Sequence, residues 1–310
     1  MKATYRFVLA ACLCMAGLQA AAQGIIVYKT DGTKVYYKDS EVERVGVYGY
    51  GEEPEPQPGE DDAETKTFTV TGYGKTVMFR MKLVEAGTFQ MGRAGSEDVA
   101  TPVHQVTLTK NYYMGETEVT QALWYAVMGQ NPTSDGSQWE STYGLGDSNP
   151  AYYVSWNDCQ TFITNLNALT GATFRLPTEA EWEFAAKGGN KSQGYTYVGS
   201  NTIGDVAWYY DNSSALGSSS PDYGTHAVAT KAPNELGLYD MSGNVWEWCQ
   251  DWYGSYSSSA QTDPTGATSG SYRVGRGGSW GSIAAHCRVA HRDGYYAANR
   301  NYCLGLRLAL

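Results

Sequence analysis

Apolar residues recur with strand spacing near the start of the chain and with helical spacing in its middle. Two short apolar runs, Ile25–Tyr28 and Lys34–Tyr37, flank a turn at Asp31 and Gly32, which is the pattern of a β-hairpin. Two strands alone bury too little apolar surface to fold independently. We therefore expect residues 23–50 to form a small β element that packs on another surface or serves for attachment or spacing.

Three later segments place their apolar residues on one side of a helix. Two of them begin with a hydroxyl residue three positions before a carboxylate, Ser155 with Asp158 and Thr178 with Glu181, and this spacing predicts a capping box. The predicted helices are 120–128, 155–169 and a third that begins at Thr178 and ends before Gly188.

The sequence after Gly188 is rich in Gly, Ser, Tyr and Trp, which predicts short strands joined by long loops. Helices in one part and short strands in another indicate the α+β class, not alternating βα units. We expect one loop-rich α+β domain over residues 67–310.

The composition is that of a globular protein of 310 residues, 42% hydrophobic and 13% aromatic. The net charge of −10 disfavours nucleic acid and anionic membranes as partners, because both attract basic surfaces. The acidity is concentrated in residues 52–64, where prolines stand among carboxylates. Proline and charge repulsion keep such a segment extended, so residues 51–66 are predicted to be a linker.

Residues 1–22 have the features of a signal peptide. Lys2 and Arg6 precede an apolar core, and small residues follow up to Ala22. No later run reaches the ~18 apolar residues of a transmembrane segment. We expect export to the periplasm, the cell surface or the medium. Anchoring through a lipid on Cys12 is disfavoured, because too few apolar residues precede this cysteine.

A turn-forming Ser-Gly-Asn sequence lies between Asp240 and Glu247. The turn would bring both carboxylates near the carbonyl oxygens of Gly243 and Val245, and oxygen ligands from a loop suit Ca²⁺. The alternative is a tight turn in which Glu247 forms only a salt bridge. The sequence therefore predicts either a structural calcium site at these four residues or a turn held by an ion pair.

Arginines are numerous in the main domain, and we expect them to brace loops by pairing with carboxylates and carbonyls, not to form an anion site. Most of the main-domain arginines belong to this set, namely Arg175, Arg273, Arg276, Arg288, Arg292, Arg300 and Arg307.

Several kinds of enzyme lack their characteristic patterns in this chain. The four histidines form no HExxH motif, no Gly-Lys-Ser/Thr phosphate loop is present, and no serine stands in a GxSxG elbow. The cysteines after the signal peptide form no CxxC pair, and their disulfide pairing is left open. They are Cys159, Cys249, Cys287 and Cys303.

The C-terminal residues 281–310 contain no Lys, Glu, Gln, Met or Trp, although these five types supply 57 of the 310 residues. None of the five is encoded by a codon that ends in a pyrimidine. In their place stand clusters of unrelated side chains, set between Arg, Leu and Gly. This pattern is typical of a surface that presents varied side chains on a constant frame.

Eight separate motifs, in order along the chain, resemble those of the formylglycine-generating (sulfatase-modifying factor) family. They are 87–92 (GTFQMG), 118–120 (EVT), 154–158 (VSWND), 175–183 (RLPTEAEWE), 237–241 (GLYDM), 243–248 (GNVWEW), 276–280 (RGGSW) and 304–307 (LGLR). The resemblance covers about residues 77–310 and implies the C-type-lectin-like fold of that family. It also implies calcium at Asp240, Gly243, Val245 and Glu247.

The enzymes of that family use two closely spaced cysteines after the Gly-Gly-Ser-aromatic motif, and two soft thiolates suit a Cu(I) centre. Here residues 281–286 contain no thiol, and Cys287 stands alone. The resemblance therefore does not carry the oxidase activity to this chain, and we expect no copper.

The C-terminal segment resembles another branch with this fold, the variable proteins of diversity-generating retroelements. In these proteins the C-terminal repeat is mutated at template adenines, which would explain the missing residue types. The resemblance places variable contact positions within residues 281–303, and scaffold positions at Trp280, Cys287, Arg288, Arg292, Arg300 and Arg307. The variable positions are Gly281, Ser282, Ile283, His286, His291, Asp293, Gly294, Tyr295, Tyr296, Asn301, Tyr302 and Cys303.

The sequence thus favours an exported, non-enzymatic protein that binds an unknown protein or glycan on a cell, a phage or a host surface. One alternative is a formylglycine-generating oxidase that uses Cys287 with Cys303 or another partner. A second alternative is a structural component of the cell envelope, in which residues 23–66 do the work.

Overall fold

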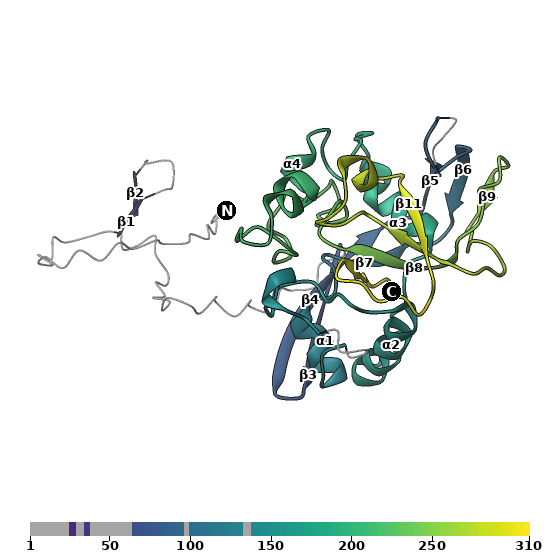
Figure 1. The fold of residues 1–310 in the computed structure, drawn as a ribbon. Helices are drawn as coiled ribbons and strands as arrows, with labels where there is room; N and C mark the ends of the chain where they lie inside the picture. The colour runs from purple at the N-terminus through teal and green to yellow at the C-terminus, as the bar shows by residue number, and fades with distance from the viewer. Residues whose placement is uncertain (1–24, 29–33, 38–63, 96–98, 133–137) are drawn as a thin grey trace, which may run out of the picture. The chain divides into compact units, whose positions relative to one another are not determined.

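The computed structural model describes residues 64–95, 99–132 and 138–310 in full, together with the backbone of two short strands near the N-terminus (Figure 1). The chain divides into two units, residues 1–57 and 58–310, and each is considered by itself. The predicted signal peptide and most of the predicted linker lie outside the described residues.

The first unit contains the strand pair that the sequence predicts. Strands β1 (Ile25–Tyr28) and β2 (Lys34–Tyr37) are antiparallel, with Ile25 opposite Tyr37 and Tyr28 opposite Lys34. Their connecting turn lies outside the described residues.

The second unit holds three small sheets and begins with β3 at Thr65, slightly before the expected start at residue 67. One sheet has the order β3 (Thr65–Gly72), β4 (Lys75–Val84) and β7 (Tyr112–Gly115). Another has the order β5 (Gly87–Met91), β6 (His104–Leu108) and β9 (Gln261–Thr262). The third has the order β11 (Arg292–Tyr295), β10 (Arg273–Arg276), β8 (Trp246–Trp252) and β12 (Leu304–Gly305).

The three predicted helices are confirmed as α1 (Gln121–Met128), α2 (Trp156–Thr170) and α3 (Glu179–Ala186). Both predicted capping boxes form, with Ser155 and Asp158 at the start of α2 and Thr178 and Glu181 at the start of α3. Shorter helical elements follow in the loops. They are η2 (Ser141–Tyr143), η3 (Gly189–Lys191), α4 (Ile203–Val206), η4 (Tyr210–Asn212), η5 (Ser214–Leu216) and η6 (Ala284–Cys287).

The core has two apolar clusters that meet at β8. The first surrounds α1 and α2, where Trp124 stacks on Phe162 with ring centroids 5.0 Å apart, and it includes Trp248 of β8. The second surrounds α3 and includes Cys249, the next residue of β8. Successive strand residues point to opposite faces, so this one strand contributes to both clusters.

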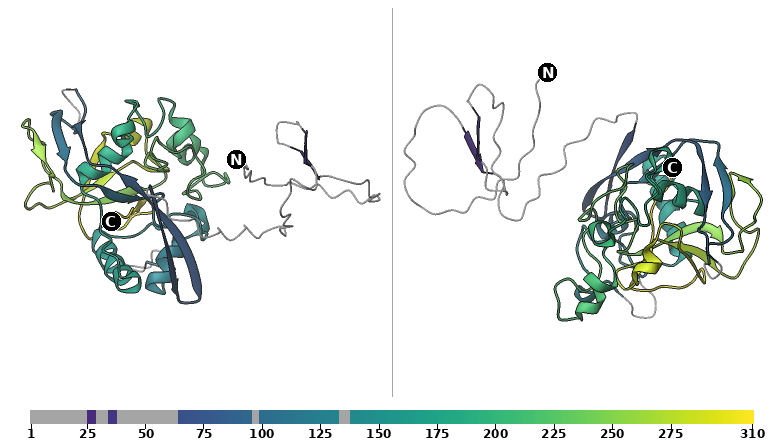
Figure 2. Two further views of the ribbon diagram at one scale, coloured as in Figure 1. Left: turned by 180° about the vertical axis from the view of Figure 1, so that it is seen from behind. Right: turned by 90° about the horizontal axis from the view of Figure 1, so that it is seen from above.

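The C-terminal residues run through the centre of the second unit, as the yellow trace in Figures 1 and 2 shows. Strand β12 pairs with β8 in parallel, and Leu306 and Leu308 are fully buried. Leu310 exchanges two backbone hydrogen bonds with Tyr113, at 3.0 and 2.9 Å. The segment before β12 is therefore anchored on both sides by core structure, and the predicted loop-rich α+β architecture is confirmed.

Candidate functional site

The candidate site is the stretch between Trp280 and β12, which folds over the third sheet. After Trp280 the chain makes a turn, forms η6 and returns as β11 beside β10, with Asp293 opposite Gly275. Trp280 is almost fully buried, and its backbone N–H donates to the carbonyl of Asn244 at 2.8 Å. The stretch is therefore fixed at its start as well as at its end.

Arginine–carboxylate pairs hold this frame. Arg292 donates two hydrogen bonds of 2.7 Å to Glu179, and Arg300 donates to both oxygens of Asp158 at 2.7 and 2.8 Å. Bidentate pairs of this kind fix both distance and orientation. The predicted bracing role is confirmed for these two arginines.

Other arginines of the predicted set act in the same way. Arg276 is fully buried and donates to Glu183 and to the carbonyls of Ala290 and His291. Arg175 pairs with both oxygens of Glu181. Arg273 donates to the carbonyl of Gln250 at 2.6 Å, and its guanidinium also lies between the rings of Trp156 and Trp252, 3.9 and 3.5 Å from their centroids.

The twelve predicted contact residues do not share one environment. Six are exposed, namely Gly281, Ile283, His286, Asp293, Tyr296 and Tyr302. Five are half-buried, namely His291, Gly294, Tyr295, Asn301 and Cys303. Ser282 is buried.

The largest exposed side chains in the stretch are apolar or aromatic. Tyr296 is 54% exposed, Ile283 52% and Tyr302 39%. Nearby, His286 and His291 stack face to face with ring centroids 4.5 Å apart. The largest exposed side chains of the stretch are thus mainly aromatic.

Some predicted contact residues instead take part in packing. The Ser282 hydroxyl accepts a hydrogen bond from the Ser279 N–H at 3.0 Å and so closes the turn after Trp280. Tyr295 packs edge-on against Trp246 and Trp248, both with centroids 5.9 Å away, and burial raises the pKa of its phenol. Cys303 packs against the first core cluster, where burial raises the pKa of its thiol to about 11.

Gly294 faces inward as well. A Cβ atom there would lie 3.0 Å from the ring of Tyr253 and 3.1 Å from the Cβ of Tyr272, so a side chain would press on both. The residue bias of the C-terminal segment carries no information on the direction of each side chain. Which residues of the stretch face solvent and which face inward therefore becomes clear only in the structure.

Aromatic residues outside the stretch belong to the same surface, and the sequence gives little indication of them. Tyr143 stacks on Tyr302 at 4.9 Å, and Tyr223 meets Trp280 edge-on at 4.9 Å. Tyr272 lies 4.5 Å from Tyr296. The only sequence signal for them is a tyrosine within a Gly- and Ser-rich loop, which many other tyrosines of this chain share.

One of the predicted calcium ligands, Glu247, is bonded to other residues of the protein. Both oxygens of Glu247 accept from Arg307, at 2.7 to 3.0 Å, and one also accepts from the Trp182 indole N–H at 2.6 Å. Glu247 is thus the carboxylate of an ion pair. Its oxygen lone pairs accept hydrogen bonds from Arg307 and Trp182, whereas a metal ligand would use these lone pairs to bind the ion. Glu247 therefore forms the ion pair of the alternative prediction, and calcium at these four residues stays a prediction.

Two further buried carboxyls lie near this ion pair. Asp240 accepts from the Ala229 N–H at 2.7 Å, and burial raises its pKa to about 6. Glu118 accepts from the Val245 N–H at 3.0 Å, and burial together with the Asp240 charge raises its pKa well above the ordinary range. Among the described residues, no group of three or more His, Cys, Asp or Glu side chains is placed to hold a metal ion.

The thiols give no sign of an activated cysteine. All four are free, and Cys159, Cys249 and Cys287 are buried. Burial raises the pKa of Cys287 to about 12. A reactive cysteine needs a depressed pKa, because the thiolate is the nucleophile and the metal ligand.

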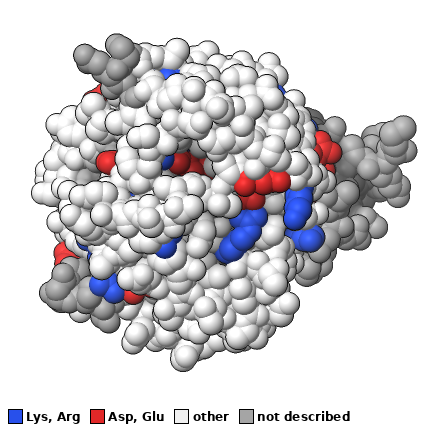
Figure 3. Space-filling view, turned by 90° about the vertical axis from the view of Figure 1, so that its right-hand side faces the viewer, with Lys and Arg blue, Asp and Glu red and all other residues white. Residues whose placement is uncertain are grey.

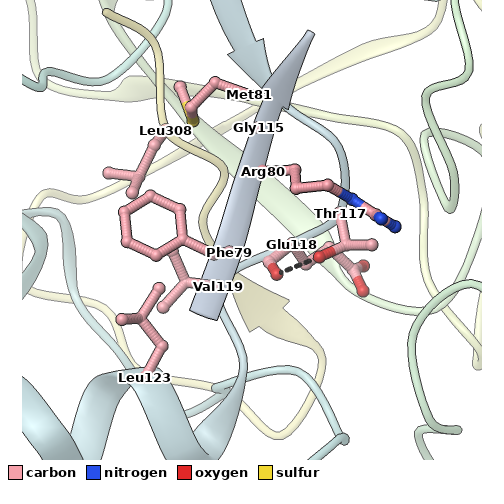
Figure 4. Close-up of a pocket in the computed structure, with 9 residues that line it drawn as sticks. All are labelled: Phe79, Arg80, Met81, Gly115, Thr117, Glu118, Val119, Leu123 and Leu308. Atoms are coloured by element: carbon pink, nitrogen blue, oxygen red, sulfur yellow. Dashed lines mark hydrogen bonds between the residues drawn. The ribbon is translucent and has the colours of Figure 1, made fainter. Parts of the chain in front are cut away.

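Two cavities among the described residues lie away from the C-terminal stretch. One encloses about 20 Å³, room for about one water, and is lined by side chains that include Phe79, Leu123 and Leu308 (Figure 4). A second, of about 250 Å³, is lined by residues that include Lys82, Lys191 and Leu236. Neither cavity is lined by a cysteine or by a residue of 281–303. No helix in the described part of the chain is long and apolar enough to cross a membrane.

Comparison with known proteins gives matches over most of the second unit. The model of the sulfatase-modifying factor enzyme 1-like domain matches residues 70–310. The chaperone protein LppX of Paenibacillus barcinonensis is 31% identical over 275 aligned residues, which cover 77% of this chain and 91% of that protein. The formylglycine-generating enzyme of Streptomyces coelicolor is 30% identical over 278 aligned residues, covering 72% of this chain and 86% of the enzyme.

Among solved structures, Treponema denticola variable protein 1 is similar, with a TM-score of 0.65 and 35% identity. The match covers 79% of this chain and 98% of that protein. These similarities confirm the predicted C-type-lectin-like fold of formylglycine-generating enzymes and the likeness to retroelement variable proteins.

Proposed function

The chain belongs to the sulfatase-modifying factor enzyme 1-like domain family, and from this premise we propose that it is an exported, non-enzymatic binding protein. It displays a diversified C-terminal surface on a lectin-like scaffold and recognises a protein or glycan on a cell, a phage or a host. Its similarity to Treponema denticola variable protein 1 supports this function.

One observation carries the proposal, and it is the separation of roles within residues 281–303. Arg292 is buried and paired, whereas Ile283 and Tyr296, on the same stretch, are more than half exposed. Exposed side chains of this kind add little to folding stability. A stretch built in this way can change its contact residues and keep its fold.

The encoding DNA tests diversification directly. We expect a reverse-transcriptase gene near this gene, together with a near-copy of the bases for the C-terminal segment that differs at adenines. Isolates of the same lineage should differ at exposed positions such as Tyr296 and keep Arg292. A segment that is identical in every isolate, with no such copy nearby, would remove the diversification part of the proposal.

Binding is tested with sister alleles that differ only in the C-terminal segment. Each purified allele is applied to arrays of surface proteins and glycans from the same habitat. We expect alleles to bind different targets and to show the same melting temperature. Identical target profiles from alleles that differ at Ile283, His286 and Tyr296 would contradict a binding role for these positions.

The enzyme alternative rests on the identity with the Streptomyces coelicolor formylglycine-generating enzyme. Its test is incubation of the copper-treated protein with a sulfatase-motif peptide, followed by mass spectrometry. We expect no conversion of cysteine to aldehyde, because the thiols of Cys287 and Cys303 are held in the protonated form. Conversion that disappears in Cys287→Ser would make the protein an oxidase.

Export and attachment are tested by cell fractionation. We expect the full chain outside the cytoplasm and a chain without residues 1–22 inside it. Removal of residues 24–62 leaves ligand binding intact if these residues serve attachment only. Loss of envelope retention without loss of binding would assign them that role.

A further inference from the structure

Each of the two exposed tyrosines of the C-terminal stretch rests on a tyrosine from outside it. Tyr302 stacks on Tyr143 with an angle of 13° between the rings. The Tyr272 hydroxyl donates to the Tyr296 hydroxyl at 3.1 Å. Tyr223 completes the first group, 6.5 Å from Tyr143 between ring centroids. We call Tyr143, Tyr223 and Tyr272 the flanking tyrosines.

Backbone contacts fix two of the flanking tyrosines in place. The Tyr143 carbonyl accepts from both the N–H and the hydroxyl of Thr225, each at 2.9 Å. The Tyr272 carbonyl accepts from the Tyr253 N–H at 2.8 Å. The backbone that carries these two rings is therefore held by residues outside 281–303.

Other large exposed side chains stand on segments bonded to the stretch. Tyr272 is 39% exposed, and Tyr210, whose N–H donates to the Ser282 carbonyl at 2.9 Å, is 42% exposed. Tyr272 contacts Tyr296, and Tyr210 is bonded to the residue before Ile283. Exposed apolar side chains on neighbouring segments, rimmed by polar residues, are typical of a protein–protein interface.

Three polar or charged side chains of the stretch form bonds within the protein. Asp293 accepts from the Gly294 N–H at 2.7 Å and from the Tyr295 hydroxyl at 3.2 Å. The Asn301 side chain accepts from the N–H of Cys303 at 3.3 Å, and Arg300 is paired with Asp158. These bonds use part of the capacity that Asp293 and Asn301 would need to bind sugar hydroxyls. Elsewhere, on the side where β5, β6 and β9 stand in Figure 1, most of the surface is likewise uncharged (Figure 3).

We propose, on the basis of the binding function above, that the recognition surface includes the flanking tyrosines and that its partner is a protein with an apolar, nearly uncharged contact surface. The flanking tyrosines hold the rings of Tyr296 and Tyr302 before the partner arrives. Pre-ordered tyrosines lose little conformational entropy on binding, which is the advantage that Tyr brings to antibody paratopes. Variable positions then select the partner, and the flanking tyrosines supply contact area to every allele.

The test uses the intact chain and a phage-displayed library of small folded protein domains. Binders are selected on the wild-type protein, and their affinity is then measured for Tyr143→Ala and Tyr272→Ala. The matched control is Tyr73→Ala, because Tyr73 is 67% exposed in the turn between β3 and β4. We expect each flanking substitution to weaken the selected binders by about tenfold or more, as for aromatic anchors of an interface, and the control to leave them unchanged.

Two further measurements keep the result interpretable. Tyr143→Phe and Tyr272→Phe retain the ring and are expected to restore most of the affinity, and circular dichroism of each variant establishes that it is folded. An array of neutral glycans is probed in parallel with the same proteins. Glycan binding that requires the flanking tyrosines, without any protein binders, would overturn the choice of partner.

The same binders separate this inference from the function on which it rests. If Tyr296→Ala and Ile283→Ala weaken binding but Tyr143→Ala and Tyr272→Ala do not, the flanking tyrosines are not part of the surface and the inference fails alone. If none of the four substitutions has an effect, the binding function of the C-terminal stretch fails with it.

Discussion

At the scale of single residues, Tyr295 and Tyr296 are neighbours in sequence with opposite roles. Tyr295 packs on two tryptophans, whereas Tyr296 points to solvent. Tyr295 is the last residue of β11, where successive side chains alternate in direction. Substitutions at these two positions are therefore expected to have unequal effects on stability.

We predict that Tyr295→Ser destabilises the protein and that Tyr296→Ser does not. Loss of a half-buried ring costs about 1–3 kcal/mol, somewhat below the range for fully buried aromatics, whereas an exposed substitution stays within about 0.5 kcal/mol. Urea unfolding of the two variants gives both values. Equal free energies of unfolding would show that Tyr295 is as free to change as its neighbour.

Asp251 provides a pH-dependent prediction. Its side chain is 3% exposed, it accepts from the Glu179 N–H at 3.0 Å, and burial raises its pKa from 3.8 to about 8. Because the folded-state pKa lies above the unfolded value, its contribution to stability is present below pH 3.8 and is lost as the pH rises through about 8.

Asp251→Asn keeps an acceptor for the Glu179 N–H and removes the titration. We expect the melting temperature of the variant, relative to wild type, to rise steadily from about pH 4 to pH 8 and then to level off. Thermal melts across this range provide the measurement. A constant difference at all pH values would mean that Asp251 keeps its ordinary pKa in the folded protein.

At the scale of elements, the turn before β8 is held by the Arg307–Glu247 pair. We predict that Arg307→Met lowers the free energy of unfolding by about 3–5 kcal/mol, because it leaves a buried carboxylate without its partner. EGTA should leave the melting temperature of the wild-type protein unchanged. A calcium-dependent rise in melting temperature would show that the ion binds after all and displaces this pair.

The loop that carries Tyr143 touches the loop before β8 at Gly224. Gly224 has φ +109°, and an added Cβ would lie 2.7 Å from the Tyr143 carbonyl carbon. Gly217 also has positive φ, +79°, but no atom lies within 4 Å of its Cβ position.

We predict that Gly224→Ala displaces Tyr143 and weakens the binding of partners that contact Tyr302. The substitution also introduces a backbone strain of about 1–3 kcal/mol, which lowers stability. Gly217→Ala shares the strain and serves as the control. Tyr143–Tyr302 contacts are followed by nuclear Overhauser effects. Unchanged contacts in Gly224→Ala would show that the two loops move independently.

The sequence predicts the helices well, because their signals are local. Ser155 with Asp158 and Thr178 with Glu181 satisfy the helix start within three residues, whatever surrounds them. The pairing of β12 with β8, and of β9 with β6, joins distant segments and has no local signal. The residue bias of the C-terminal stretch is also a local signal, so it could be recognised from the sequence. The contact of Tyr143 with Tyr302 joins distant segments and could not.

At the scale of the whole molecule, the last residues close the structure. Leu306, Leu308 and Leu310 each accept or donate backbone hydrogen bonds to the segment around 113–119. We predict that a chain lacking residues 304–310 gives no cooperative thermal transition. Substitution of Ile283 and His286 by serine, as a control, should leave the transition intact. A truncated chain that still melts cooperatively would show that the core closes without these residues.

This closure has a consequence for the proposed diversification. A ribosome would reach β12, which pairs with β8 in the core, only after reading every diversified codon. A premature stop or a shifted frame within that stretch would leave a chain without β12 and with an interior open to proteases. Degradation would then remove defective copies, and the surviving chains would be those that were read through β12.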